Sequence, residues 1–223
     1  MPLWLILPLS LALILPSGEN ATAALKEIPL PKPRLSGSMS LEEAIATRRS
    51  VRSFREAPLE LHELSQLLWA AQGITQGQAG FRTAPSAGAT YPLEVYIAAG
   101  SVNDLPPGLY KYKAQGHELT ELAKGDFRSA LHDAALRQRC VKDAPVVIII
   151  AAAYERTMAR YGERSIRYVN MEAGHSAQNV CLQAVSLRLG SVVVGAFNDE
   201  SVKRALSLPQ NENPLYLIPI GRP

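Results

Sequence analysis

The densest group of residues that could do chemistry is a cluster of arginines around a serine. Arg48, Arg49 and Arg52 fall within five residues, with Ser50 between them, in the string RRSVRSF. Guanidinium groups this close repel one another, and a dianion among them relieves the repulsion because planar guanidinium forks pair with phosphate oxygens. The alternative is a solvated helix end, where cations complement the helix dipole. The cluster therefore indicates either a phosphate site or a helix terminus.

Two other segments could let a flat or anionic ligand approach the backbone. Residues 84–94 read APSAGATYPLE, and their small side chains leave backbone amides uncovered, with the Ser86 hydroxyl as a polar partner. Residues 193–197 read VVGAF, a strand pattern in which Gly195 would let a ligand lie against the main chain. The alternatives are an ordinary loop leading into a strand and a simple β-bulge.

Side chains arranged for catalysis by themselves are not evident in the sequence. The four histidines are scattered, and there is no G-x-S-x-G elbow, Walker loop or G-x-G-x-x-G fingerprint. Glu172 and His175 have a spacing that suits a metal, but a single pair of this kind is usually structural, so no metal is expected. The hard chemistry would then belong to a bound cofactor, with the protein supplying binding and orientation.

Composition limits the other possibilities. The chain of 223 residues is 47% hydrophobic and 19% charged, with a net charge of +3. These values are typical of a globular protein and exclude a strongly basic nucleic-acid binder. The two cysteines, Cys140 and Cys181, have no zinc spacing, and we expect two buried free thiols and not a disulfide framework.

The N-terminal region is expected to precede the fold proper. Residues 3–15 form an uncharged apolar run that is too short to span a bilayer, and Ala21-Thr22-Ala23 resembles a cleavage site. Residues 1–23 are therefore predicted to be a signal peptide, with export to a periplasmic or extracellular location. An uncleaved leader would instead give a membrane-tethered or cytoplasmic protein. Residues 24–37 contain alternating prolines and are predicted to form an extended arm.

The remaining chain, 38–223, is predicted to be one α+β domain, because helical and strand patterns are interleaved without repeats. Ser40 begins a capping box, and Gly73 is placed to cap the second helix. The apolar run PVVIIIAAA predicts a strand covered on both faces. Helices are expected at 41–49, 59–72, 166–189 and 200–206, and strands at 93–99, within 108–122, 145–153, 191–197 and 215–220.

Five motifs, in order, resemble the FMN-dependent nitroreductase family, and most closely its SagB-type branch, which includes thiazole and oxazole oxidases. They are RRSVRSF, APSAGATYPLEVYI, RYGERSIRYVNMEAGHSAQNVCLQA, LGSVVVGAF and IPIGRP. The resemblance covers residues 40–223. It implies a nitroreductase-like fold in a homodimer, with a central, largely antiparallel mixed sheet flanked by helices.

The resemblance also implies cofactor-binding residues. Arg48, Arg49 and Ser50 are similar to residues that bind the FMN phosphate and ribityl chain. Arg52 is placed like a residue at the pyrimidine edge, where its charge would stabilise anionic reduced flavin, and Arg222 like one that closes on the phosphate. The middle motif implies contacts, commonly across the dimer, from Pro85, Ser86 and Ala87. The strand motif implies a backbone facing flavin N5, at Val194, Gly195 and Ala196.

One departure from the family pattern affects the expected reaction. Azoline-oxidising members are expected to carry a Lys-Tyr pair, where this chain has Arg160 and Tyr161. An arginine stays protonated and is no general base at neutral pH. The resemblance thus implies a reductase that passes hydride from NAD(P)H through FMN to a nitroaromatic or quinone, with Tyr161 as a possible catalytic residue. The alternatives are a peptide azoline oxidase and a non-catalytic flavin carrier or sensor.

Overall fold

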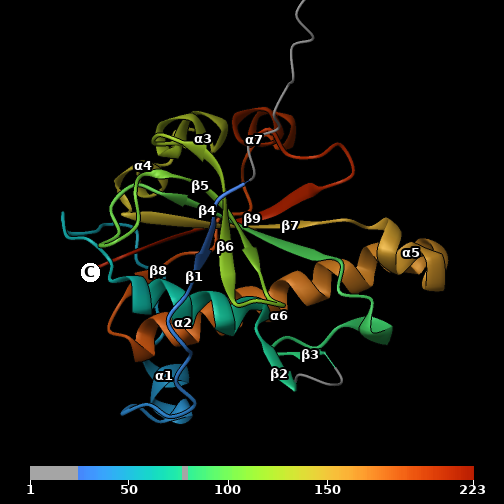
Figure 1. The fold of residues 1–223 in the computed structure, drawn as a ribbon, viewed down its shortest axis with the longest axis horizontal. Coiled ribbons are helices and arrows are strands. Elements are labelled where there is room, and N and C mark those ends of the chain that lie inside the picture. Colours follow the sequence, from blue (N-terminus) through green and yellow to red (C-terminus); the bar gives the residue numbers. More distant parts are fainter. Residues whose placement is uncertain (1–24, 77–79) are drawn as a thin grey trace, which may run out of the picture.

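A single seven-stranded sheet divides the molecule into two helical layers (Figure 1). The computed structural model describes residues 25–76 and 80–223, so the predicted signal peptide lies outside the described residues. The strand order is β1-β6-β5-β4-β7-β9-β8, and neighbouring strands pair antiparallel, which confirms the predicted fold class. The strands are β1 (Glu27–Pro29), β4 (Leu93–Ala99), β5 (Gly108–Lys113), β6 (Glu118–Lys124), β7 (Val146–Ala152), β8 (Gly190–Ser191) and β9 (Asn213–Gly221).

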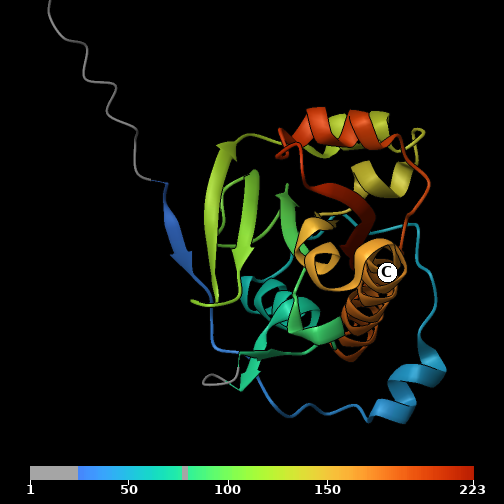
Figure 2. The ribbon, with the colours of Figure 1, turned by 90° about the vertical axis from the view of Figure 1, so that its right-hand side faces the viewer.

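The helices cover the two faces of the sheet unequally. One face carries α1 (Leu41–Thr47), α2 (Leu61–Gln72) and α6 (Ser165–Ser186), and Figure 2 shows α2 and α6 side by side beneath the sheet. The other face carries α3 (Arg128–Ala134), α4 (Arg139–Asp143) and α7 (Asp199–Leu206). Helix α5 (Glu155–Tyr161), the turns η1 (Ala87–Ala89) and η2 (Gly162–Arg164), and the hairpin β2 (Ile74–Gln76) and β3 (Phe81–Arg82) complete the fold. None of the helices in the described ranges is long and apolar enough to cross a membrane.

Strand β7 is the core strand that its continuous apolar run predicts. All of its residues are buried, and successive side chains enter different cores. Ile148 packs in the core under α2 and α6, whereas Ile149 packs in the core under α3, α4 and α7. Because successive side chains of a strand point to opposite faces, a strand covered by helices on both sides must be apolar at every position.

The helix signals are largely confirmed, but several ends differ: α2 begins at Leu61 and not at 59, and α6 ends at Ser186 and not at 189. The Ser40 hydroxyl accepts from the Glu43 N–H at 3.0 Å, but α1 ends at Thr47 and not at Arg49. Gly73 does cap α2, although with φ −62° and not in the left-handed conformation. A Cβ on Gly73 would lie 2.2 Å from Cδ1 of Trp69 and 2.6 Å from its carbonyl oxygen. Close approach, and not backbone handedness, therefore requires glycine here.

The strand predicted at 191–197 is wrong in length. Only Gly190 and Ser191 form a strand, and Val194 pairs separately with Leu217 through bonds of 2.8 and 2.9 Å. Pro219 lies opposite the interruption, where its carbonyl accepts from Val192 at 3.3 Å. Because proline has no N–H, it cannot donate a bond in return, and the ladder is broken between the two pairs.

The proline-rich arm runs extended along the domain. Its first residues form β1 and pair with β6, and Leu30 is buried in the core. The Pro31 carbonyl accepts from the Ser65 hydroxyl at 2.6 Å and lies 3.0 Å from Nε2 of His117. The arm is thus joined to both α2 and the β5–β6 hairpin.

Candidate functional site

The arginine cluster lies at the sheet edge beyond β8. Ser50 forms a parallel bridge with Ser191, and the Val51 N–H donates to the Ser191 carbonyl at 2.9 Å. The exposed Gly195 follows Val194 on the segment that leads away from β8 along the same edge. The structure therefore brings two of the three predicted groups, RRSVRSF and the strand end, to one edge of the sheet.

The three arginines of the cluster have different surroundings. The Arg49 guanidinium donates to the carbonyls of Ala46 and Arg48, at 3.0 and 2.8 Å. It therefore provides hydrogen bonds to backbone carbonyls at the C-terminal end of α1. Within the described ranges, the guanidiniums of Arg48 and Arg52 have neither an ion-pair nor a hydrogen-bond partner. The helix-end interpretation thus applies to Arg49, and the other two cations remain available to an anion.

Arg48 and Arg52 face opposite layers. Burial raises the pKa of the Cys181 thiol on α6, while a hydrogen bond to Ser191 and the charge of Arg48 act in the opposite direction. Burial likewise raises the pKa of Cys140 on α4, against the charge of Arg52. Both cysteines are free and buried, as predicted.

The strand end presents exposed backbone. Gly195 and Ala196 are both exposed, and a Cβ on Gly195 would meet only the Tyr216 ring, at 3.6 Å. The Ala196 carbonyl accepts from the Gln138 amide at 2.9 Å, which ties this segment to the residue before α4. The backbone here is thus accessible to a ligand, and the hydrogen bond from Gln138 holds it in place.

Arg222 is engaged with a buried carboxylate on α2. Its guanidinium makes two bonds of 2.8 Å to the oxygens of Glu63, whose side chain is 8% exposed. Glu63 also accepts from the Glu60 N–H at 2.9 Å, and the Arg222 carbonyl accepts from Arg55 at 3.0 Å. A phosphate bound by Arg222 would compete with this ion pair, so the predicted phosphate role stays a prediction.

The Pro85–Ala87 segment leads into a loop that α5 holds from the side. Gly88 has φ +60°, and a Cβ there would lie 2.6 Å from the Tyr161 hydroxyl. The Arg160 guanidinium donates to the Gly88 carbonyl at 3.2 Å and lies 5.6 Å from the centre of the Tyr161 ring. Arg160 and Tyr161 are therefore packed against the loop.

Two more residues of α5 fix the far end of the loop. Arg156 donates to the Tyr91 carbonyl at 3.0 Å and pairs with Glu94. The hydroxyls of Thr157 and Thr90 are 2.8 Å apart. The sequence prediction missed α5 because its apolar positions are too few to show a clear helical stripe.

Within one chain, this loop lies apart from the arginine cluster. Ser86 affects the pKa of Glu172 on α6, whereas the charge of Arg48 affects the pKa of Cys181, nine residues further along the same helix. These helix positions are separated by roughly 13 Å at a rise of 1.5 Å per residue. One chain therefore does not bring all three predicted groups to one place.

Glu172 is a buried titratable residue beneath the loop. Its exposure is 2%, and burial raises its pKa to about 7, against the opposing effects of a hydrogen bond from Ser86 and the charge of Arg82. Because the folded protein holds this proton more tightly, the stability it contributes is present below about pH 4.5 and is lost as pH rises through about 7. The Glu172 Oε1 atom has no hydrogen-bond partner in the described part of the chain.

Sequence reasoning considered Glu172 only as a metal partner of His175. The structure buries Glu172 and exposes His175, so the two side chains have different surroundings. A signal was present, since Glu172 is a charged residue on the helical stripe that contains Val169, Ala173 and Ser176, all buried. A carboxylate on a buried stripe is rare without a partner or a role.

Comparisons with known proteins agree with this architecture. The family model described as the Nitroreductase family matches residues 45–222. Protein MJ1384 of Methanocaldococcus jannaschii, provisionally named a nitroreductase, is 48% identical over 82% of this chain and 91% of its own length. A crystal structure from Ralstonia eutropha JMP134, with a similar provisional name, has a TM-score of 0.78 at 34% identity and covers 88% of this chain and 89% of that one.

A more distant relative comes from a toxin operon. The trifolitoxin operon protein TfxC of Rhizobium leguminosarum bv. trifolii is 25% identical over 86% of this chain, which spans 57% of the relative's length. The family model covers most of the domain, the M. jannaschii protein matches over most of its own length, and the R. eutropha structure shares the fold. The chain therefore belongs to the nitroreductase family of oxidoreductases.

Proposed function

We propose that the protein binds FMN and uses it to pass hydride from NAD(P)H to an electron-poor acceptor such as a nitroaromatic or a quinone. The observation that carries the proposal is the sheet edge where Ser50, between Arg48 and Arg52 in the chain, pairs with Ser191, four residues before the exposed Gly195. The Arg48 guanidinium, which has no partner among the described residues, and the Ser50 hydroxyl are donors suited to a phosphate.

The residues present fit this cofactor in their chemistry. Arg48 and Ser50 would bind the phosphate and ribityl chain, and Arg52 would place a positive charge beside the ring. The open backbone at Gly195 would let a flat ring lie close, since among the described residues only the Tyr216 ring lies within 4 Å of its Cβ position. When bound, FMN would supply two-electron chemistry at its ring. The charge of Arg52 would favour the anionic reduced form of that ring.

The test is whether purified protein retains FMN and turns over. We expect a yellow protein whose flavin absorbance is bleached by NADH or NADPH and restored by menadione or a nitroaromatic, with steady-state turnover. A flavin that is bound but never turned over with any reductant and acceptor would support the carrier or sensor alternative. Protein that binds no FMN would contradict the proposal.

A dimer is the second part of the proposal, because one chain separates the Pro85–Ala87 segment from Arg48. Large apolar side chains are exposed on the helices of the α1/α6 face: Leu41 62%, Ile45 57%, Ile166 52% and Met171 53%. A second copy would cover them and could supply the missing segment. We expect sedimentation at micromolar concentration to show a dimer that carries FMN.

The dimer prediction has a matched test. Replacing Met171 with Glu should shift the protein to monomers and weaken FMN binding, whereas Leu136→Glu, at a residue that is 69% exposed beside α3, should do neither. A flavin-loaded wild-type monomer at micromolar concentration would contradict the shared site.

Oxidation of azoline-bearing peptides is a second candidate function, favoured by the likeness to TfxC. The structure places Arg160 on the Gly88 carbonyl, where its protonated guanidinium can hold the loop but cannot accept a proton. We therefore expect the wild-type protein to reduce simple acceptors and to leave an azoline peptide unchanged in a mass-spectrometric assay. Efficient azole formation by the wild type would overturn this expectation, and Arg160→Lys tests whether lysine restores it.

A further inference from the structure

The loop at residues 88–91, which follows the Pro85–Ala87 segment, has an unfavourable backbone conformation. Gly88, Ala89 and Tyr91 have φ values of +60°, +54° and +45°. Glycine adopts such values freely, but a Cβ crowds the backbone there, so Ala89 and Tyr91 would favour other conformations if they were unconstrained. Residues of this kind keep a left-handed conformation only where their surroundings impose it. The loop 88–91 therefore depends on the contacts that hold it.

Two arginines of α5 hold the two ends of the loop. The Arg156 guanidinium donates to the Tyr91 carbonyl at 3.0 Å, and the Arg160 guanidinium donates to the Gly88 carbonyl at 3.2 Å. The two arginines are one helical turn apart, so they reach the loop from the same side of α5. The first and last residues of the loop are thus bonded to one helix.

A threonine of α5 holds the middle of the loop. The Thr90 hydroxyl donates to the Ala87 carbonyl at 3.0 Å, and it lies 2.8 Å from the hydroxyl of Thr157, which is buried. Because a hydroxyl has a single proton, Thr157 is the donor in the contact between the two threonines. We refer to Arg156, Thr157 and Arg160 together as the α5 clamp.

A carboxylate of the sheet orients Arg156. While one nitrogen of the guanidinium bonds to the Tyr91 carbonyl, another pairs with Glu94 on β4. Glu94 is 14% exposed, and its second oxygen pairs with Lys111 on β5 at 3.0 Å. A planar guanidinium with two fixed partners has little freedom to rotate. The sheet therefore fixes the direction in which Arg156 donates to the loop.

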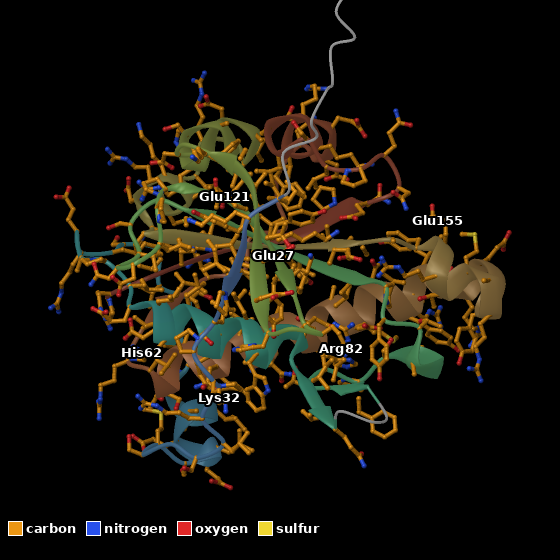
Figure 3. All side chains as sticks on the ribbon, in the orientation of Figure 1. Glu27, Lys32, His62, Arg82, Glu121 and Glu155 are labelled. Carbon is orange, nitrogen blue, oxygen red and sulfur yellow. The ribbon has the colours of Figure 1, made fainter. Side chains whose placement is uncertain are left out.

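A second element contacts the loop through the Tyr91 side chain. The Arg82 guanidinium lies 4.9 Å from the centre of the Tyr91 ring, which is a cation–π distance. Figure 3 shows Arg82 on the β2–β3 hairpin and Glu155 at the start of α5, the two elements that reach the loop. Tyr91 is thus held at both its carbonyl and its ring.

Hydrogen bonds connect the loop conformation to the Pro85–Ala87 segment. The Ser86 carbonyl accepts from the Ala89 N–H at 3.1 Å, and the Ser86 hydroxyl accepts from the Tyr91 N–H at 2.9 Å. Both donors belong to residues with positive φ, so a change of either φ would move the N–H group that Ser86 accepts from. The conformation of the segment therefore depends on that of the loop.

We propose that Arg156 is a positioning residue that, with the rest of the α5 clamp, holds the loop 88–91 in its left-handed conformation and so presets the Pro85–Ala87 segment for a flavin ring. This inference rests on the proposed function, because it takes the flavin as the ligand of that segment. A ligand that binds one conformation has an apparent Kd equal to its intrinsic Kd divided by the fraction of protein in that conformation. Loss of the clamp therefore weakens flavin binding although no flavin contact is removed.

The first test is Arg156→Ala, with flavin binding followed by fluorescence quenching. We expect the Kd values for FMN and for riboflavin to rise about tenfold each, the effect of letting one left-handed residue relax. Riboflavin has no phosphate, so equal factors separate the segment from the phosphate site. Urea unfolding should change little, because the Arg156–Glu94 pair is partly exposed. Met158→Ala, at a residue of α5 that is 44% exposed, is the control and should leave both Kd values unchanged.

Substitutions at Ala89 separate positioning from a merely structural role. The Ala89 side chain is exposed, so larger side chains can be accommodated. Asparagine adopts the left-handed conformation more readily than alanine, whereas β-branched valine adopts it less readily. Adding Ala89→Asn to Arg156→Ala should therefore return both Kd values to within about threefold of the wild type. Ala89→Val should raise them about tenfold although every α5 contact is kept.

Amide hydrogen exchange tests the clamp without flavin. Exchange in the peptide 84–94, measured by mass spectrometry, should be faster in Arg156→Ala than in the wild type, because the loop opens more often. Addition of Ala89→Asn should slow it again. If Arg156→Ala does not fold, Ala89→Val makes the same test from the side of the loop, with the α5 residues unchanged.

The outcomes distinguish this inference from the proposed function. Wild-type affinity for both flavins in Arg156→Ala, or a loss that Ala89→Asn does not restore, would overturn the inference and leave the proposed function standing. Unchanged exchange of the peptide 84–94 in Arg156→Ala would overturn it as well. Wild-type protein that binds neither flavin would instead contradict the proposed function, and with it the flavin role of the clamp.

Discussion

Replacing Arg48 with Ala is expected to weaken FMN affinity about tenfold to a hundredfold. A hydrogen bond to a charged group contributes about 1.5–3 kcal/mol, and each 1.4 kcal/mol is a factor of ten in Kd. The Arg48 guanidinium makes no ion pair within the described chain, so its loss should fall mainly on the ligand and little on the fold. Titration of apoprotein with FMN, followed by fluorescence quenching, measures the change.

Two matched variants make this prediction specific. Arg49→Ala should have a smaller effect on FMN, because that guanidinium is bonded to the carbonyls at the end of α1. Arg204→Ala removes an exposed helix-end arginine on the opposite face, bonded to Ser201, and should leave FMN affinity unchanged. Full FMN affinity in Arg48→Ala would refute the phosphate site.

Replacing Glu63 with Gln is expected to lower the free energy of unfolding by about 2–4 kcal/mol. The substitution leaves the guanidinium of Arg222, which is 30% exposed, without its carboxylate partner. Removing one member of a buried pair costs about 3–5 kcal/mol, and the partial exposure of Arg222 reduces that figure. Urea denaturation with a constant slope measures the difference.

The same variant shows where Arg222 acts. If Arg222 serves only the ion pair, FMN affinity should stay within about twofold of the wild type. Tighter FMN binding in Glu63→Gln would show that the released guanidinium reaches the phosphate. Asp126→Asn is the stability control, because its pair with Arg128 is more exposed and should contribute about 1 kcal/mol or less. A loss in Glu63→Gln no larger than in this control would contradict the structural role.

The features that the sequence predicted correctly depend on neighbouring residues. The Ser40 cap, the apolar stripe of α2 and the continuous apolar run of β7 each follow from side-chain spacing within one element. The motifs that indicated the family are local sequence patterns as well. Local propensity and periodicity act over a few residues, so they can be recognised in a single chain.

Features that depend on partners far along the chain were outside the reach of such patterns. The ion pair between Arg222 and Glu63, which are 159 residues apart, is one such feature, and the predicted phosphate role of Arg222 stays a prediction. The strand predicted at 191–197 is interrupted because Pro219 lies opposite it, and the helix α5 that holds the Gly88 loop was not predicted.

Tertiary structure also decided which charged groups are available for chemistry. Arg48 and Arg49 are adjacent and chemically identical. In the folded protein the Arg49 guanidinium is hydrogen-bonded to the end of α1, whereas the Arg48 guanidinium has no partner among the described residues. Glu172 acquires its raised pKa because the fold buries its side chain on α6. The sequence determines which ionisable groups are present. Their pKa values depend on desolvation and on neighbouring groups, which come from segments that only the fold brings into contact.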